Sequence, residues 1–417
     1  MPASLRSVEE HRRIVAELIA AQPATMATLA DAEGLVLAHD VAAEVPLPVF
    51  DNSAMDGYAV LADDIASAAA DHPVKLPVAE DIPAGRTDIP TLEPGTAHRI
   101  MTGAPLPAGA TAVVPVEATD GRTDIVSIRV AVDEGRHVRH AGEDVAAGTT
   151  VLRAGQLVTP AVIGLAAALG LPALAVIPRQ RVLVISTGSE LVVPGNPLQP
   201  GQIYESNAVM LAAAVRDAGA TVVATATAGD DVAEFAAVLD RYAAESDLII
   251  TSGGVSAGAY EVVKDAFGRA GDQGVEFAKV AMQPGMPQGT GRVAGRRRSS
   301  GAGQEAGTAI VALPGNPVSA LVSFEVFIRP ALRVAMGLPA PERPRRTAVL
   351  TETVTSPGGK RQFRRGVLNA AAGTVTSYGP PASHHLRWLA SANCLLDIPA
   401  DVVEVPAGSQ LQVWDLT

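Results

Sequence analysis

The stretch "SDLIITSGGVSAGAYEVVKDAF", residues 246–267, indicates the fold class of the chain. Its apolar run Leu248–Ile250 ends abruptly in a loop rich in Gly and Ser, and a segment with helical periodicity follows. A fully apolar strand, a permissive loop and a helix in this order are typical of a parallel sheet that helices cover on both faces. In such a sheet, ligands bind beyond the carboxyl ends of the strands.

The same unit repeats on both sides of this stretch. The segments "RVLVIS", "TVVATATA" and "TAIVAL" read as further apolar strands, and the helical segments "SNAVMLAAAVRDAG", "VAEFAAVLDRYAAE" and "SALVSFEVFIRPAL" follow them. Ser206 or Asn207 is the expected cap of the first of these helices. We therefore expect a multidomain α/β and β protein with a central doubly wound, mostly parallel sheet from about residue 179.

The regions outside the central sheet have a different pattern. Ser7–Glu10 is a capping box that predicts a helix through about Ala21, and a short helix is expected over Met26–Ala30. Short Val and Ile runs broken by Pro and Gly predict a β-rich module over Lys75–Arg139. Residues 340–417 are again β-like and predict a small β-barrel or sandwich.

Composition excludes several classes of function. The 417 residues carry 32 basic and 44 acidic side chains, a net charge of −12, and only 3% aromatic residues. This balance disfavours binding of nucleic acid. Cys394 is alone and predicts a cytoplasmic chain without an intrachain disulfide. The uncharged stretch 154–178 is cut by Pro160, Gly170 and Pro172, so it predicts a short helix capped by Thr159 and then a strand, and no membrane span.

Four loops are expected at the carboxyl edge of the sheet. "SGGVSAG" and "PGNPVS" offer backbone N–H groups, which favour phosphate, whereas "TGSEL" and "GDD" bring the carboxylates of Glu190, Asp230 and Asp231. Carboxylates beside phosphate call for a cation, and Mg²⁺ takes such mixed oxygen ligands. The predicted ligand is a phosphorylated molecule with Mg²⁺.

Each loop taken alone also fits an ordinary turn, and Asp-Asp before a helix fits an ordinary N-cap. Four such loops on one edge of the sheet favour a ligand-binding site over four independent turns. For His384-His385 we favour a surface or packing role over metal binding. For Arg296–Arg298 we favour a solvated loop over a site for an anionic partner. A P-loop signature is absent from the sequence.

Seven motifs occur in a familiar order, namely "FDNSAMDGYAV", "RIMTGAPLP", "AGEDVAAG", "STGSEL", "GQIYESN", "SGGVSAG" and "LPGNPVSA". Together they resemble the molybdopterin molybdenumtransferase family, which includes the E domain of gephyrin. The resemblance implies four domains: residues 1–46 with 140–178, an inserted β-rich domain 47–139, a molybdopterin-binding α/β domain 179–330 and a C-terminal β-barrel 340–417. It also implies a homodimer with an active site composed from two subunits.

The resemblance further implies the last step of molybdenum cofactor assembly. Adenylylated molybdopterin would be hydrolysed with Mg²⁺ and molybdate, releasing AMP, after an adenylyltransferase that is a possible partner. The functional positions implied are Asp56, Thr102, Asp144, Glu190, Asp230 and Lys279. Metal binding is expected from Glu190, Asp230 and Glu261, with Lys264 a weaker cationic candidate beside Lys279. The expected phosphate cradle comprises Ser252, Gly253, Gly254, Ser256, Gly258, Pro314, Gly315, Asn316, Pro317 and Ser319.

Two departures from the family pattern bear on the site. Gln283 and Met286 stand where many relatives carry Lys, and Glu261 replaces a shorter carboxylate. Fewer cations near an anion site weaken charge-assisted hydrogen bonds. Two alternatives therefore stay beside the enzyme: a molybdopterin-binding scaffold or carrier without turnover, and an adenylyltransferase acting one step earlier.

Overall fold

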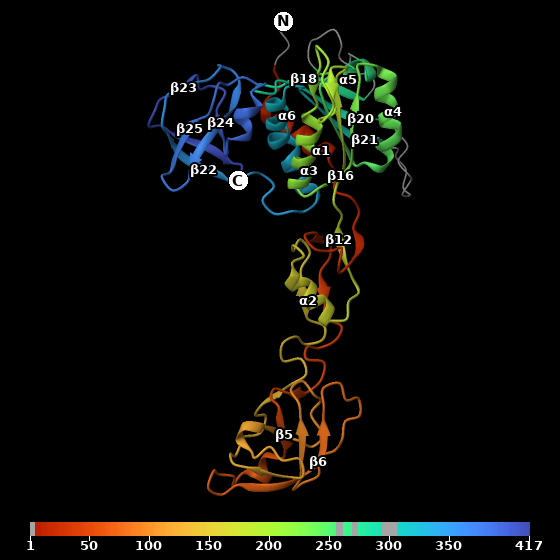
Figure 1. The fold of residues 1–417 in the computed structure, drawn as a ribbon, viewed down its shortest axis with the longest axis vertical. Helices are drawn as coiled ribbons and strands as arrows, with labels where there is room; N and C mark the ends of the chain where they lie inside the picture. The colour runs from red at the N-terminus through yellow and green to blue at the C-terminus, as the bar shows by residue number, and fades with distance from the viewer. Residues whose placement is uncertain (1–4, 256–261, 269–273, 294–306) are drawn as a thin grey trace. The chain divides into compact units, whose positions relative to one another are not determined.

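The computed structural model describes residues 5–255, 262–268, 274–293 and 307–417. The predicted residues Ser256, Gly258 and Glu261, and Arg296–Arg298, lie outside these ranges. The chain forms two compact units, one of residues 1–25 and 177–417 and the other of residues 26–176. Each unit is described by itself below (Figure 1).

A six-stranded sheet forms the centre of the first unit. Its order is β16 (Thr221–Ala228), β13 (Arg181–Thr187), β17 (Leu248–Ser252), β21 (Thr308–Leu313), β20 (Pro287–Val293) and β18 (Val275–Lys279). The first four strands are parallel, whereas β20 pairs antiparallel with both of its neighbours. The prediction of a mostly parallel sheet is confirmed, but sequence reasoning missed β18 and β20.

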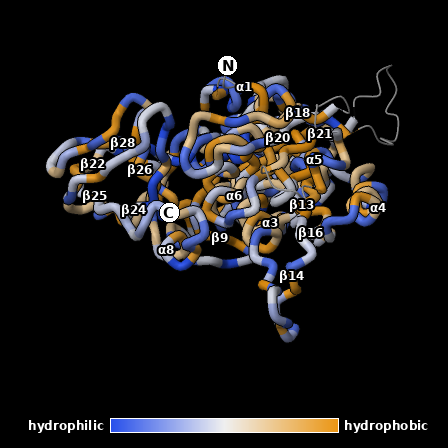
Figure 2. The backbone as a smooth tube through the Cα atoms, turned by 90° about the horizontal axis from the view of Figure 1, so that it is seen from above, coloured by the Kyte–Doolittle hydropathy of each residue, from blue (hydrophilic) through white to orange (hydrophobic). Residues whose placement is uncertain are grey.

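Alternate residues of the central strands pack against different helices. Val182 and Val184 of β13 belong to one core cluster with α1, α3, α6 and α7, while Leu183 and Ile185 belong to another with α4 and α5. Both faces of a strand are thus buried, which explains the continuous apolar runs. In Figure 2 the hydrophobic stretches of the tube gather around β13, β20 and β21.

The covering helices are α1 (Val8–Leu18), α3 (Asn207–Asp217), α4 (Val232–Tyr242), α5 (Val262–Ala266), α6 (Pro317–Ser323) and α7 (Arg329–Ala335). The predicted capping box of α1 holds, because Ser7 Oγ accepts the Glu10 N–H at 3.0 Å. The α1 helix ends at Leu18, three residues earlier than expected. A π-helical turn, Phe324–Ile328, joins α6 to α7.

A closed five-stranded barrel forms the C-terminal part of the first unit, which confirms the predicted barrel. Its strands are β24 (Arg361–Asn369), β25 (Thr374–Ser377), β22 (Arg345–Leu350), β28 (Gln410–Asp415) and β26 (Cys394–Ile398), and β26 pairs back to β24. Closure leaves no free sheet edge. A short helix, α8 (Leu386–Ala390), precedes β26.

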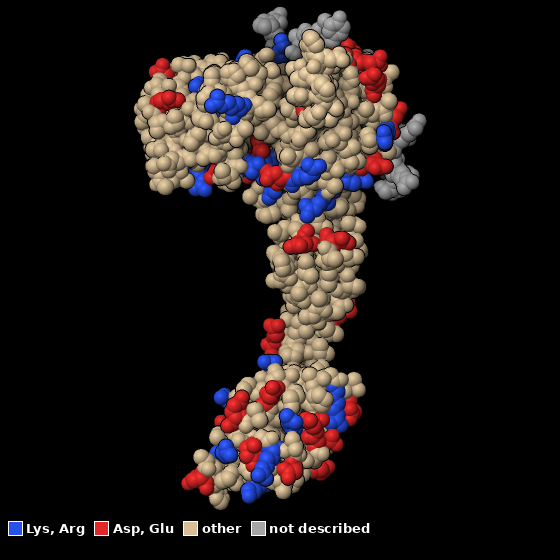
Figure 3. All heavy atoms as spheres, in the orientation of Figure 1, with Lys and Arg blue, Asp and Glu red and all other residues tan. Residues whose placement is uncertain are grey.

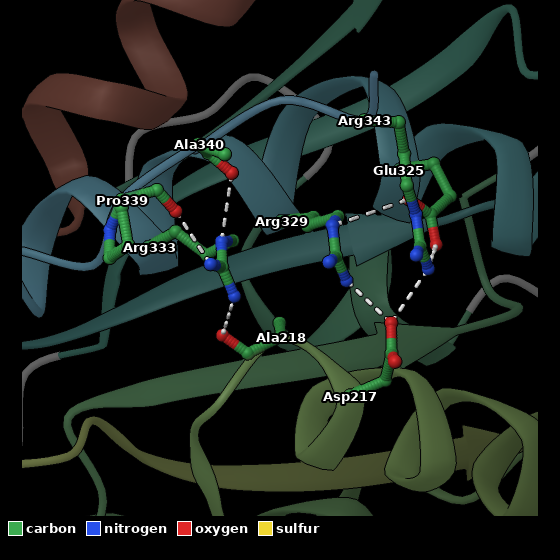
Figure 4. Close-up of polar contacts among 8 residues, drawn as sticks. All are labelled: Asp217, Ala218, Glu325, Arg329, Arg333, Pro339, Ala340 and Arg343. Carbon is green, nitrogen blue, oxygen red and sulfur yellow. Dashed lines mark hydrogen bonds and ion pairs between the residues drawn. The ribbon is translucent and has the colours of Figure 1, made fainter. Parts of the chain in front are cut away.

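An ion-pair network fixes the linker between the α/β part and the barrel (Figure 4). Arg343 on the linker binds Glu325 and Asp217, at 2.9 and 2.6 Å, and Arg329 also binds Asp217. Burial opposes ionisation of Asp217, but Arg343 and Arg329 together hold its pKa below the usual value. Arg333 adds hydrogen bonds to the carbonyls of Pro339 and Ala340.

The second unit contains a three-stranded sheet, a five-stranded sheet and two pairs of short strands, β11 (Thr150–Leu152) with β3 (Val41–Ala42) and β10 (Val138–Arg139) with β4 (Asn52–Ser53). In the three-stranded sheet, β1 (Thr25–Thr28), β12 (Ala173–Ile177) and β2 (Val36–Leu37) lie beside α2 (Pro160–Ala168), which is capped by Thr159 as predicted. The short helix expected over Met26–Ala30 is wrong, because β1 pairs with β12 there. Strand pairing across the sheet outweighs a weak local helix preference.

The larger sheet of the second unit has the order β8 (Ala112–Pro115), β5 (Gly57–Val60), β7 (Ala97–Ile100), β6 (Val74–Ile82) and β9 (Ile125–Ile128). On the face that Figure 3 draws, acidic and basic side chains are interspersed over this part of the chain. None of the helices in the described ranges combines the length and apolar character needed to cross a bilayer.

Candidate active site

A pocket of about 750 Å³ lies where β13, β17 and β21 end. Its size is that of a small-molecule site. The loops that follow these strands line it, together with the start of α3 and a loop of the barrel. The described lining residues are Ser186, Thr187, Gly188, Glu190, Leu191, Ile203, Tyr204, Glu205, Ser206, Asn207, Asp230, Ser252, Gly253, Gly254, Val255, Gly315, Asn316, Pro317, His384 and Leu386.

The backbone after β17 needs glycine at its first turn. Gly253 has φ +97°, and a Cβ there would fall 2.6 Å from Thr187 Oγ1 and 2.7 Å from the Thr187 carbonyl oxygen. The loop therefore passes against the end of β13 with no room for a side chain. This close approach leaves the loop backbone facing the pocket.

Asn207 joins the two glycine loops. Its Nδ2 donates to Ser252 Oγ at 2.8 Å and to the Gly315 carbonyl at 2.6 Å, and Ser252 Oγ donates to the Pro314 carbonyl. Loops from β17 and β21 are thus held together by one side chain at the start of α3. Ser206 is the N-cap residue of α3, which agrees with the prediction of Ser206 or Asn207, but its side chain makes no capping bond.

Glu205 supplies that capping bond. Its Oε1 accepts the Ala208 N–H at 2.7 Å and the Ser186 hydroxyl at 2.7 Å, and the side chain is buried. A carboxylate at a helix N-terminus is favoured by the exposed N–H groups. Sequence reasoning used "GQIYESN" only as a family motif and missed Glu205 and Asn207 as pocket residues.

The loops "TGSEL" and "GDD" are tied together as well. The Ser189 N–H donates to Asp230 Oδ2 at 3.2 Å, and the Asp230 N–H donates to Ser189 Oγ at 2.9 Å. Asp231 turns away from this pair and caps α4 by accepting the N–H groups of Ala233 and Glu234. Of the two adjacent aspartates, only Asp230 lines the pocket.

The described lining is acidic. It contains the carboxylates of Glu190, Glu205 and Asp230, but no Lys or Arg among the residues that the structure describes. The side chain of Glu190 folds back over Gly188, and a Cβ added to Gly188 would lie only 2.5 Å from Glu190 Oε2. Oxygen ligands from Glu190 and Asp230 suit Mg²⁺, which binds through one or two carboxylates and completes its shell with substrate oxygens and water. Within the described ranges, no three acidic, His or Cys groups are close enough to hold a metal by themselves.

The eight described residues of the predicted phosphate cradle divide into two groups. Ser252, Gly253, Gly254, Gly315, Asn316 and Pro317 line the pocket. Pro314 and Ser319 are buried and do not appear in its lining.

The predicted cations lie elsewhere in the same unit. Lys279 ends β18, an outer strand at the same sheet edge, and does not line the pocket. Lys264 Nζ lies 5.8 Å from the centre of the Phe277 ring. Gln283 accepts a hydrogen bond from Gln362 of the barrel, at 2.7 Å, and so serves packing between the two parts.

Asp56 and Thr102 meet in the second unit. Asp56 Oδ1 accepts the Thr102 N–H at 2.7 Å and its hydroxyl at 2.9 Å, and these two bonds hold the pKa of Asp56 below its usual value. Asp144 is exposed in a loop whose N–H groups at 144 and 145 donate to the Leu47 carbonyl. The structure thus pairs the first two residues and places all three in the other unit from Glu190 and Asp230.

His384 is the pocket residue that the sequence gave least reason to expect. It belongs to the barrel loop 380–386, and the sequence favoured a surface or packing role. No sequence motif connects a His-His pair with a strand edge more than fifty residues away. The sequence therefore gave no signal that His384 lines the pocket.

Three family models together match most of the chain. They are described as MoeA N-terminal region (domain I and II) at residues 6–170, probable molybdopterin binding domain at 183–334, and MoeA C-terminal region (domain IV) at 347–416. The first match covers most of the second unit, the second covers the α/β part of the first unit, and the third covers its barrel.

Similar proteins match the chain end to end. Molybdopterin molybdenumtransferase 2 of Mycobacterium tuberculosis is 72% identical, over 99% of this chain and 100% of the relative. Molybdopterin molybdenumtransferase 1 of the same species is 37% identical, over 98% of both chains. A crystal structure of the molybdopterin biosynthesis MoeA protein from Pyrococcus horikoshii superposes with a TM-score of 0.78, at 26% identity, over 99% of this chain and 100% of that one.

Proposed function

The chain belongs to the MoeA family of molybdopterin molybdenumtransferases, which insert molybdenum in molybdenum cofactor biosynthesis, and we propose that its substrate is adenylylated molybdopterin. Molybdate is the second substrate. The observation that supports this proposal is the pocket at the strand ends, where two glycine loops face the carboxylates of Glu190 and Asp230. Such a pocket takes a phosphoanhydride only if a cation lies between the two kinds of group.

We infer that Mg²⁺ is the cation and that Glu190 and Asp230 hold it. When bound, Mg²⁺ offsets the charge of the phosphate oxygens and orients them. The loop backbones at 253–254 and 315–316 face the pyrophosphate group. Asn207 fixes the spacing of these two loops, and Ser189 fixes the position of Asp230. Glu261, which lies outside the described residues, is proposed as a third ligand from the resemblance alone.

We also propose a homodimer in which Asp56, Thr102 and Asp144 of one subunit complete the site of the other. Two points support this: the resemblance implies a composite site, and Asp56 is an exposed carboxyl whose pKa the hydrogen bonds of Thr102 hold below its usual value. Lys279 then supplies positive charge from the outer strand. The four domain boundaries named above stay predictions, as does an adenylyltransferase partner.

The decisive experiment follows AMP release from adenylylated molybdopterin with Mg²⁺ and molybdate. We expect turnover by the wild-type chain, loss of turnover without Mg²⁺, and loss in Glu190→Gln with an unchanged unfolding temperature. Tight binding of the substrate without AMP release by the wild-type chain favours the scaffold. Normal turnover in Glu190→Gln removes that carboxylate from the site.

A further inference from the structure

The pocket described above contains a histidine, His384, to which the proposed reaction assigns no role. Its described lining holds three carboxylates, Glu190, Glu205 and Asp230, and no Lys or Arg. His384 is the remaining side chain among these residues that can carry a positive charge. An anionic substrate in this pocket therefore meets one protein cation at most from the described lining.

The barrel loop that carries His384 is built to stay in place. Arg365 is buried and donates Nη1 to the carbonyls of Ala382 and His385, at 3.2 and 3.1 Å, and Nη2 to the carbonyl of Pro380. Burial lowers the pKa of Arg365, and neighbouring Arg364 adds to this. Because one buried guanidinium donates hydrogen bonds to three carbonyls of the same loop, it fixes the backbone conformation of that loop.

Two further contacts hold the loop, one to the α/β part and one within the loop itself. The Val318 N–H donates to the Ser383 carbonyl at 3.1 Å, one residue before His384. The rings of His384 and His385 meet edge to face with centres 4.4 Å apart. His385 Nδ1 is buried without a hydrogen-bond partner, so His385 is the packed member of the pair and His384 is the exposed one.

We propose that His384 is a substrate-binding residue that donates a charge-assisted hydrogen bond to a phosphate oxygen in the pocket. This inference rests on the proposed function for the identity of the substrate. The ionisable groups to consider are Glu190, Glu205 and Asp230 in the same pocket lining and His385 beside it. On the barrel side, Arg365 is bound to the loop backbone and Arg387 stacks on Trp388. An imidazolium binds an anion more strongly than a neutral imidazole does, so the contribution of a histidine to anion binding depends on pH.

The test uses the full-length chain and inorganic pyrophosphate with Mg²⁺, measured by titration calorimetry at about pH 6 and about pH 8, near the limits within which histidines lose their charge. We expect His384→Ala to weaken binding about tenfold at the lower pH, as for one hydrogen bond to a charged group, and less at the higher pH. His384→Gln keeps a hydrogen-bond donor without the charge, so its affinity for pyrophosphate should lie between those of the wild type and His384→Ala. His39→Ala is the matched change at an exposed histidine of the other unit and should bind as the wild type does.

Kinetics with adenylylated molybdopterin provide the second readout. A binding role predicts that His384→Ala raises KM about tenfold and changes kcat less than about twofold. Equal pyrophosphate affinity in the wild type and His384→Ala, or no pyrophosphate binding by the wild type, would overturn the inference. If His384 governs pyrophosphate binding but the wild type releases no AMP, the proposed reaction fails and the anion-binding role stands.

Discussion

Asn207 Nδ2 lies 2.8 Å from Ser252 Oγ, and this contact connects helix α3 with the glycine loop after β17. The same nitrogen binds the Gly315 carbonyl, so one amide sets the spacing between two loops that are about sixty residues apart in sequence. The pocket depends on this spacing because the loop backbones face it from both sides.

The energy of this contact can be isolated by a double-mutant cycle. We expect Asn207→Ala and Ser252→Ala to be non-additive by about 1 kcal/mol in the free energy of unfolding, which is typical of one hydrogen bond. Urea unfolding of the two single variants and the double variant measures this term. Additive effects would show that the two side chains do not stabilise each other.

The adjacent aspartates offer a matched pair of variants. Asp230 lines the pocket, whereas Asp231 caps α4. Asp230→Asn should lower kcat about a hundredfold, the loss typical of one electrostatic group, with an unchanged unfolding temperature. Asp231→Ala should instead cost about 1 kcal/mol of stability and leave kcat unchanged. Equal kinetic losses in the two variants would contradict this division of roles.

His11 should make the chain less stable in acid. Burial, and next the charge of Arg6, lowers the pKa of His11 from 6.5 to about 3. Between these values the unfolded chain binds more protons than the folded one, so stability is full above pH 6.5 and decreases as the pH falls. The decrease is about 1.4 kcal/mol per pH unit.

Urea midpoints between pH 7 and about pH 4 measure this dependence. His11→Leu should flatten it, because the ring packs edge to face against Phe327 in an apolar setting. His39→Leu changes an exposed histidine and should leave the slope as it is. An unchanged slope in His11→Leu would assign the acid sensitivity to other groups.

Thr102 should control the ionisation of Asp56. Removing the hydroxyl in Thr102→Val leaves only the N–H bond to Asp56 Oδ1, so the pKa of Asp56 should rise toward its usual value. Carboxyl carbon NMR of the full chain follows this titration, with Asp56→Asn used for assignment. Thr87→Val, a change at an exposed threonine of the same unit, is expected to leave the Asp56 titration unaltered.

Cys394 should be inert in the native barrel. Burial raises the pKa of its thiol to about 12, and the charge of Asp415 adds to this, so almost no thiolate forms near neutral pH. A thiol reagent at about pH 8 should label the chain only when the barrel opens. Ser391→Cys places a thiol at an exposed position nearby and should react at once; fast labelling of the wild type would contradict the burial.

Local signals in the sequence predicted several elements well. Ser7 and Thr159 cap their helices because an N-cap needs only residues within one turn. The helix expected over Met26–Ala30 failed for the opposite reason, because β1 is a strand through pairing with β12, which is distant in sequence. Strand β20 pairs with its sequence neighbours β18 and β21, and it was missed because its residues PQGTGRV form no apolar run.

The sequence by itself determined the four parallel strands of the central sheet, because strands buried on both faces are continuously apolar. It also determined the β character of the C-terminal part and the family, because the motifs that carry the resemblance are runs of consecutive residues. Only the tertiary structure decided which polar residues share the pocket. It separated Asp230 from Asp231, brought Glu205 and Asn207 into the lining and placed His384 there from the barrel. The physical reason is that a side chain's direction depends on capping bonds and on packing between loops, and these contacts form between segments far apart in the chain.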